Sequence, residues 1–172
     1  FGAIEEGGYH HYATYLKRQI QVEAEEKVPE GKMAKLLYDM YQPDCAKYAV
    51  ESDVPQIYEL LLENFDLQAD HIPSEDDLLQ IVKEKEVMIY KIGDKIECFF
   101  IYRREGKKLY CAFSYNHASA DILYSIERRV KEIEYEENGI KMHYAWFNAE
   151  NKKALRRNAW KDTKIRDYIF VK

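Results

Sequence analysis

The residues that could do chemistry gather in two segments, FSYNHASADIL at 113–123 and WFNAENKKAL at 146–155. Each segment has the pattern of a strand that leads into a helix, and the first carries small residues in its turn. Small side chains let a ligand approach the backbone closely, and Ser119 could donate a hydrogen bond to a phosphate at the helix N-terminus. Alternatively, Ser119 simply caps the helix, with Asp121 favourable to the helix dipole. The pattern indicates either a cofactor loop or a structural turn.

Other kinds of site find little support in the sequence. The histidine pair His10-His11 and His143 have no neighbours at metal-ligand spacing, so no metal site is predicted. No Ser/His/Asp order, P-loop or GxGxxG motif is present. Trp146 and Phe147 lie in a predicted strand and are expected to belong to the core rather than to a base-stacking platform.

The cysteines, at 45, 98 and 111, form neither a CxxC motif nor a metal-ligand spacing. Their odd number favours a reducing cytoplasm over a disulfide framework. Cys98 and Cys111 lie inside apolar runs, where a thiol behaves as a small hydrophobe. No apolar run approaches the roughly 18 residues of a membrane span, so none is indicated.

Length and composition bound the class of protein. A chain of 172 residues suits one ordinary domain, and 47% hydrophobic with 33% charged residues is the balance of a globular protein. The net charge of −5 argues against a general nucleic-acid binder. A basic stretch remains, but a solvated helix face is its simplest interpretation; it comprises Lys152, Lys153, Arg156 and Arg157.

From residue 47 onward the sequence predicts a tight alternation of strands and helices. Asp53 and Ser74 are good caps for two helices, and Gly-containing turns separate three consecutive strands. The sequence Asn138-Gly139 is a typical helix C-terminus. The expected strands are 48–50, 87–92, 96–102, 109–115, 142–147 and 168–171, and the later helices are 120–137 and 150–160.

Residues 1–46 differ from the rest. Tyr9, Tyr12, Leu16 and Ile20 recur at helical spacing, although the stretch from Thr14 to Val22 also alternates as a strand would. We favour the helix. A second helix is predicted from Lys32 to Tyr41. Since so short a segment cannot bury a stable core alone, we expect a helical N-terminal extension, 1–46, packed on a main domain, 47–172.

The order of elements in 47–172 resembles that of the GCN5-related N-acetyltransferases. Local matches are SDVPQIYELL, GDKIECFFIY and the run Phe147 to Asn151 followed by Ala154. The resemblance implies an α/β (α+β) fold, an acyl-CoA N-acyltransferase-like mixed central sheet flanked by helices. The strands at 109–115 and 142–147 should then be parallel neighbours, because the helix at 120–137 supplies the long crossover that parallel strands need.

The same resemblance implies acyl transfer from acetyl-CoA, another acyl-CoA or a phosphopantetheine thioester to an amine, on a small molecule or a carrier protein. The pantetheine arm would lie between the two parallel strands, and a backbone N–H near Phe113 or Ser114 would stabilise the oxyanion. Asp70 and His71 could contact the acceptor, or they could belong to a polar loop without a functional role. The implied cofactor contacts are Phe113, Ser114, Tyr115, His117, Ala118, Ser119, Ala120 and Asn151.

The sequence also departs from the family where the chemistry usually lies. The loop at 116–121 has no glycine and looks short, which could suit a carrier-bound phosphopantetheine better than free CoA, and Asp121 places a negative charge near the phosphate site. Asn158 occupies the position where the family often has a Tyr that acts as the general acid and protonates the leaving thiolate. Glu97 is a substitute candidate for the general base, or an ordinary strand residue. These departures favour an alternative, a catalytically inactive domain that serves binding or assembly.

Overall fold

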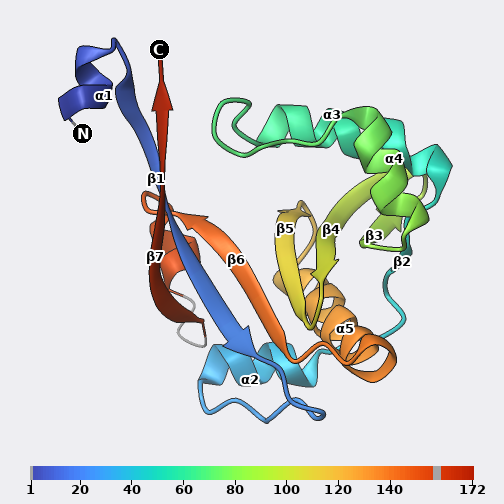
Figure 1. The fold of residues 1–172 in the computed structure, drawn as a ribbon. Coiled ribbons are helices and arrows are strands. Elements are labelled where there is room, and N and C mark those ends of the chain that lie inside the picture. The colour runs from blue at the N-terminus through green and yellow to red at the C-terminus, as the bar shows by residue number, and fades with distance from the viewer. Residues whose placement is uncertain (1, 157–159) are drawn as a thin grey trace.

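The computed structural model describes residues 2–156 and 160–172, and it places the described strands in one seven-stranded sheet of order β2-β3-β4-β5-β6-β1-β7 (Figure 1). The strands are β1 (His10–Gln21), β2 (Lys47–Tyr48), β3 (Val87–Ile92), β4 (Lys95–Glu105), β5 (Lys108–Asn116), β6 (Met142–Asn148) and β7 (Lys161–Val171). The helices are α1 (Gly2–Glu6), α2 (Lys32–Asp39), α3 (Val54–Asn64), α4 (Glu75–Lys83), α5 (Ala120–Asn138) and α6 (Lys152–Leu155), with a 3₁₀ turn at Glu51–Asp53.

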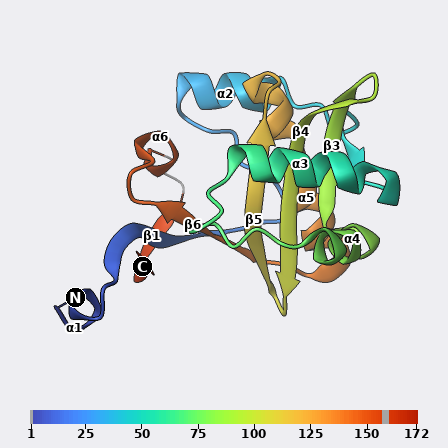
Figure 2. The ribbon, with the colours of Figure 1, turned by 90° about the horizontal axis from the view of Figure 1, so that it is seen from above.

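Each face of the sheet carries its own core. Helices α3 and α4 cover one face and α5 covers the other (Figure 2). Along β4 the side chains alternate, so that Phe99 and Ile101 join the α3–α4 core while Cys98, Phe100 and Tyr102 join the α5 core. The near-continuous apolar run of β4 therefore reflects burial on both faces.

Local signals place the helix ends where the sequence indicated them. The Ser74 hydroxyl accepts a hydrogen bond from the Asp77 backbone N–H at 3.1 Å and caps α4. Helix α5 ends at Gly139, whose φ of 64° is the left-handed conformation that glycine adopts at least cost. The mixed sheet flanked by helices is confirmed.

The helix predicted over Tyr9 to Ile20 is wrong, because this stretch forms β1. Strand β1 lies between β6 and β7 and pairs antiparallel with both, with Leu16 opposite Phe147 on one side and Arg166 on the other. The residues from Thr14 onward also have the alternating pattern of a strand. Pairing with a neighbour on both edges stabilises this strand more than local helix propensity favours a helix. These residues complete the sheet instead of forming a helical extension, whereas α2 forms as predicted and contacts α5.

The C-terminal elements also differ from expectation. Helix α6 ends at Leu155 instead of reaching 160, and β7 begins at Lys161 instead of 168. The early start of β7 follows from β1, whose residues Arg18 and Gln19 pair with Asp162 and Lys161. The remainder of the predicted helix, 157–159, lies outside the described residues.

Candidate functional site

Strands β5 and β6 are parallel neighbours, as predicted, but they remain paired over only three residues. The pairs are Lys108 with Met142, Leu109 with His143, and Tyr110 with Tyr144. Beyond Tyr110 the two strands separate, and the gap between them is visible in Figure 1.

Two features account for the separation. On β5, Ala112 is an extra residue, because Cys111 and Phe113 pair with consecutive residues of β4. Such a bulge bends a strand locally. On the other side, β6 stays paired with β1 from Met142 to Asn148. Strand β5 therefore follows β4 while β6 follows β1.

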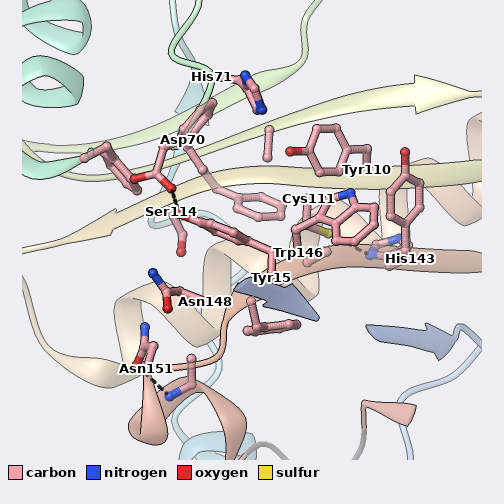
Figure 3. A pocket seen from close by; sticks show the side chains of 18 of the residues that line it. Tyr15, Asp70, His71, Tyr110, Cys111, Ser114, His143, Trp146, Asn148 and Asn151 are labelled. Carbon is pink, nitrogen blue, oxygen red and sulfur yellow. Dashed lines mark hydrogen bonds between the residues drawn. The ribbon is translucent and has the colours of Figure 1, made fainter. Parts of the chain in front are cut away.

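The separated strands enclose a cleft of about 920 Å³ (Figure 3). Its walls include residues 110–114 of β5 and 143–148 of β6, the link between α3 and α4, and two residues of α5. The cleft therefore reaches both faces of the sheet. A cavity of this size, with mixed apolar and polar walls, is typical of small-molecule sites.

The structure brings part of the predicted site together. Phe113, Ser114, Asn151, Asp70 and His71 all line the cleft. The predicted core residues Trp146 and Phe147 are half-buried and line it too. The other predicted contacts lie outside the cleft lining, namely Tyr115, His117, Ala118, Ser119 and Ala120.

In the predicted phosphate loop, residues 116–121, two backbone N–H groups donate hydrogen bonds to other groups of the protein. The N–H of His117 donates to the Glu97 carbonyl at 2.7 Å, and that of Ala118 donates to Asn116 Oδ1 at 3.0 Å. Ser119 occupies the N-cap position of α5, but its side chain makes no capping hydrogen bond. In the first turn of α5 the Ile122 N–H donates to the Ser119 carbonyl at 3.2 Å, so the N–H groups that could meet an anion are those of residues 119–121.

The structure modifies the roles expected for two carboxylates. Asp121 is 8% exposed and accepts a hydrogen bond from Gln42 Nε2 at 3.2 Å. Its carboxylate is therefore directed toward the segment that follows α2. Glu97 lies outside the cleft lining and contacts His117 Nδ1 at 2.8 Å. This hydrogen bond holds the pKa of Glu97 below its usual range, which weakens it as a base. Asn158 lies outside the described residues.

The cleft also holds a polar pair that the sequence did not predict. The Tyr15 hydroxyl, on β1, donates to Asp70 Oδ1 at 2.5 Å, and the Asp66 N–H donates to Asp70 Oδ2 at 2.6 Å (Figure 3). Burial and the Asp70 carboxylate raise the pKa of Tyr15, so the phenol stays protonated. The strand-like alternation from Thr14 was the one signal for this placement.

A thiol and an imidazole also meet in the cleft. Cys111 Sγ, on β5, lies 3.8 Å from His143 Nδ1, on β6. His143 is 2% exposed, and its Nε2 has no hydrogen-bond partner. Burial, with a smaller effect of Lys131, lowers the pKa of His143 to about 3, so the ring is neutral at pH 7.

Within 2–156 and 160–172, no three His, Cys, Asp or Glu side chains are grouped so that they could hold a metal ion. None of the helices in those ranges is both long and apolar enough to cross a membrane.

No protein-family model and no curated protein matches the chain, but solved structures do. A GCN5-related N-acetyltransferase from Sphaerobacter thermophilus superposes with a TM-score of 0.63 at 16% identity, over 98% of this chain and 54% of that one. A putative GNAT-family acetyltransferase from Novosphingobium aromaticivorans gives 0.59 at 14%, over 95% and 66%. A probable N-acyltransferase of unknown function from Enterococcus faecalis gives 0.56 at 12%, over 99% and 42%.

The chain therefore has the fold of the GCN5-related N-acetyltransferases, as a divergent example of it. It spans about half the length of the Sphaerobacter protein that it matches. At these identities the likeness defines the fold, and the activity has to be argued from the cleft.

Proposed function

We propose that the protein is an N-acyltransferase that moves an acyl group from a pantetheine thioester, acetyl-CoA or another acyl-CoA, to an amine. The observation that carries this proposal is the separation of β5 and β6 beyond Tyr110 and Tyr144. A separated pair presents strand edges to a ligand, and an extended pantetheine arm carries amide groups that can pair with such edges.

The donor end of the cleft is formed by β5 and α6. The backbone at Phe113 and Ser114 lines the cleft just past the Ala112 bulge, where an N–H could meet a developing oxyanion. Asn151 Oδ1 caps α6 by accepting from the Ala154 N–H at 3.0 Å, so its amide N–H groups are the ones that can face a ligand.

The acceptor end of the cleft is rich in carboxylates. Asp66 and Asp70, in the link between α3 and α4, line it, and His71 follows them in the same link. Asp70 is fixed by Tyr15 and by a backbone N–H, so it is oriented before a ligand arrives. A positioned carboxylate can hold an ammonium group and take its proton before attack. This supports a small-molecule or carrier-protein amine as acceptor.

One observation favours the alternative of a catalytically inactive domain in binding or assembly. The N–H groups of His117 and Ala118 are engaged within the loop, which leaves fewer donors for a pyrophosphate. The same feature is compatible with a donor whose single phosphate is attached to a carrier protein.

Calorimetric titration with acetyl-CoA, followed by an assay for free thiol in the presence of amines, tests the proposal. Binding with amine-dependent thiol release supports the enzyme. Binding without turnover across amines of different size and charge supports the inactive domain, and no binding of acetyl-CoA or S-acetyl-phosphopantetheine rejects a thioester site.

A further inference from the structure

The cleft has a closed end, where β5 and β6 come together on the α5 side of the sheet. Cys111, Lys131 and His143 line this closed end, and the pairing of the two strands begins beside them. Figure 3 shows Cys111 and His143 at the end of the cleft away from Asn151. Asp70, which we assign to the amine, reaches the cleft from the α3–α4 link instead. The closed end is therefore separate from both the donor contact at Asn151 and the acceptor carboxylate.

The path of the chain places the closed end beside the acyl group of a bound thioester. Strand β5 ends at Asn116, and α5 then returns from Ala120 to Asn138, ahead of β6, whose Met142 pairs with Lys108. The phosphates belong near the start of α5, and the proposed oxyanion contact at residues 113–114 lies further back along β5. An acyl chain that continues in the same direction beyond its carbonyl carbon enters the closed end.

The His143 ring offers a ligand a buried polar atom at this end. The residue is 2% exposed, and its Nε2 has no hydrogen-bond partner. A buried polar group without a partner is unfavourable, so such a group calls for an explanation. Cys111 Sγ lies 3.8 Å from Nδ1, and a thiol that donates to Nδ1 leaves the proton of the neutral ring on Nε2. The ring then presents an N–H donor to an acceptor atom in the cleft.

Lys131 is the charged side chain of α5 that lies nearer to this ring. Burial, with a smaller effect of Lys131, lowers the pKa of His143 to about 3. Glu127 also lines the cleft, but its charge acts on Cys98, whose pKa is raised to about 12 mainly by burial and less by Glu127. Cys98 lies opposite the last residue of β5, toward the phosphate end. The closed end is therefore positively charged, and the negative charge lies further along the helix.

Lys131 retains hydrogen-bond donors for a ligand. Its Nζ lies 3.4 Å from Glu26 Oε1, which is longer than the usual 2.7–2.9 Å of a strong charge-assisted hydrogen bond. An ammonium group has three donors, so this one contact leaves others. The Lys131 side chain is 20% exposed, so a carboxylate that met it there would be partly shielded from water. One carboxylate that contacts both Lys131 and His143 Nε2 would satisfy both groups.

We infer that the cleft prefers a donor whose acyl group ends in a carboxylate, a short dicarboxylic monothioester of the size of succinyl-CoA. The carboxylate would accept hydrogen bonds from Lys131 Nζ and from the His143 Nε2–H. The inference rests on the proposed function and names the acyl group for it. It concerns recognition of the donor alone and leaves the transfer to the amine as proposed.

Calorimetric titration of the full chain with succinyl-CoA, butyryl-CoA and acetyl-CoA at one salt concentration tests the inference. Butyryl has as many carbons as succinyl but no carboxylate. We expect the wild type to bind succinyl-CoA at least about tenfold more tightly than butyryl-CoA. Lys131→Met should abolish this preference and leave acetyl-CoA affinity unchanged, which also shows that the variant is folded. Lys131→Arg, which keeps the charge, should keep the preference.

Arg129→Met is the matched control, because Arg129 is another partly exposed basic residue of α5 but lies outside the cleft lining. It should bind the three thioesters as the wild type does. Binding of acetyl-CoA without a preference for succinyl-CoA over butyryl-CoA overturns the inference and leaves the proposed function intact. A preference that survives in Lys131→Met, or is lost equally in Arg129→Met, also overturns it. Absence of binding of all three thioesters rejects both proposals.

Discussion

Tyr15 and Asp70 are joined by a 2.5 Å hydrogen bond that connects the N-terminal strand with the loop after α3. Tyr15 belongs to β1, which fills the position between β6 and β7, so the N-terminal segment supplies a wall of the cleft. The contact fixes the carboxylate that we assign to the acceptor amine.

Replacing Tyr15 with Phe should lower kcat/KM for the amine about tenfold while the affinity for acetyl-CoA stays unchanged, because the change releases Asp70 and leaves the donor end intact. The fold should lose about 1 kcal/mol, since a hydrogen bond to a charged group is worth roughly 1.5–3 kcal/mol when buried and less when half-exposed. Tyr41→Phe removes a similar, half-buried bond to Glu132 outside the cleft lining and is the control. Equal kinetic effects of the two changes would contradict the assignment.

The buried imidazole of His143 should make stability depend on pH. Its pKa is about 3 in the folded chain and about 6.5 when unfolded, so between these values the unfolded chain binds the extra proton. Stability is therefore lost as the pH falls, by about 2 kcal/mol between pH 7 and pH 5 from this group. Urea unfolding of wild type and His143→Gln at both pH values measures the difference, which should be absent in the variant. An identical pH dependence in both proteins would contradict it.

The ion pair between Arg104 and Glu134 should matter for stability alone. Arg104 Nε and Nη2 contact the two Glu134 carboxylate oxygens at 2.8 and 2.7 Å, and Glu134 is fully buried on α5. Glu134→Ala leaves Arg104 partly buried without its main partner, which should cost about 3–5 kcal/mol in urea unfolding. The double change Arg104→Met with Glu134→Leu should recover most of that loss. Cofactor affinity should be unaffected at temperatures where each variant remains folded.

A negative charge added at the start of α5 should affect ligands that bind through phosphates and leave unaffected a ligand that binds through the thioester arm alone. Ser119→Asp should stabilise α5 by about 0.3–1 kcal/mol, because a negative charge at a helix N-terminus is favourable. It should weaken acetyl-CoA binding through repulsion of the pyrophosphate. S-acetyl pantetheine, which has no phosphate, should bind the wild type and the variant equally. Equal weakening of both ligands would mean that the loop does not face the phosphates.

The parallel pair β5 and β6 could be predicted from the order of elements that the chain shares with the family it resembles, because the helix at 120–137 supplies the crossover that parallel strands need. The sequence was insufficient for β1, because the partners that make Leu16 part of a strand lie at the other end of the chain. The cleft depends on the Ala112 bulge, which carries no distinctive residue type. Cys111 and His143 meet only through strand register, so each alone resembled an ordinary strand residue.

The central claim is that the gap between β5 and β6 binds a pantetheine thioester, and calorimetry with acetyl-CoA on three proteins tests it most directly. Ser114 is exposed on β5 and lines the cleft, so Ser114→Trp should fill the cleft without loss of folding. Lys108 is exposed on the same strand outside the cleft lining, so Lys108→Trp is the matched control. We predict that wild type and Lys108→Trp bind acetyl-CoA alike, and that Ser114→Trp binds at least about tenfold more weakly, a loss of about 1.4 kcal/mol. Unchanged affinity in a folded Ser114→Trp variant, or no binding by the wild type, would contradict the claim.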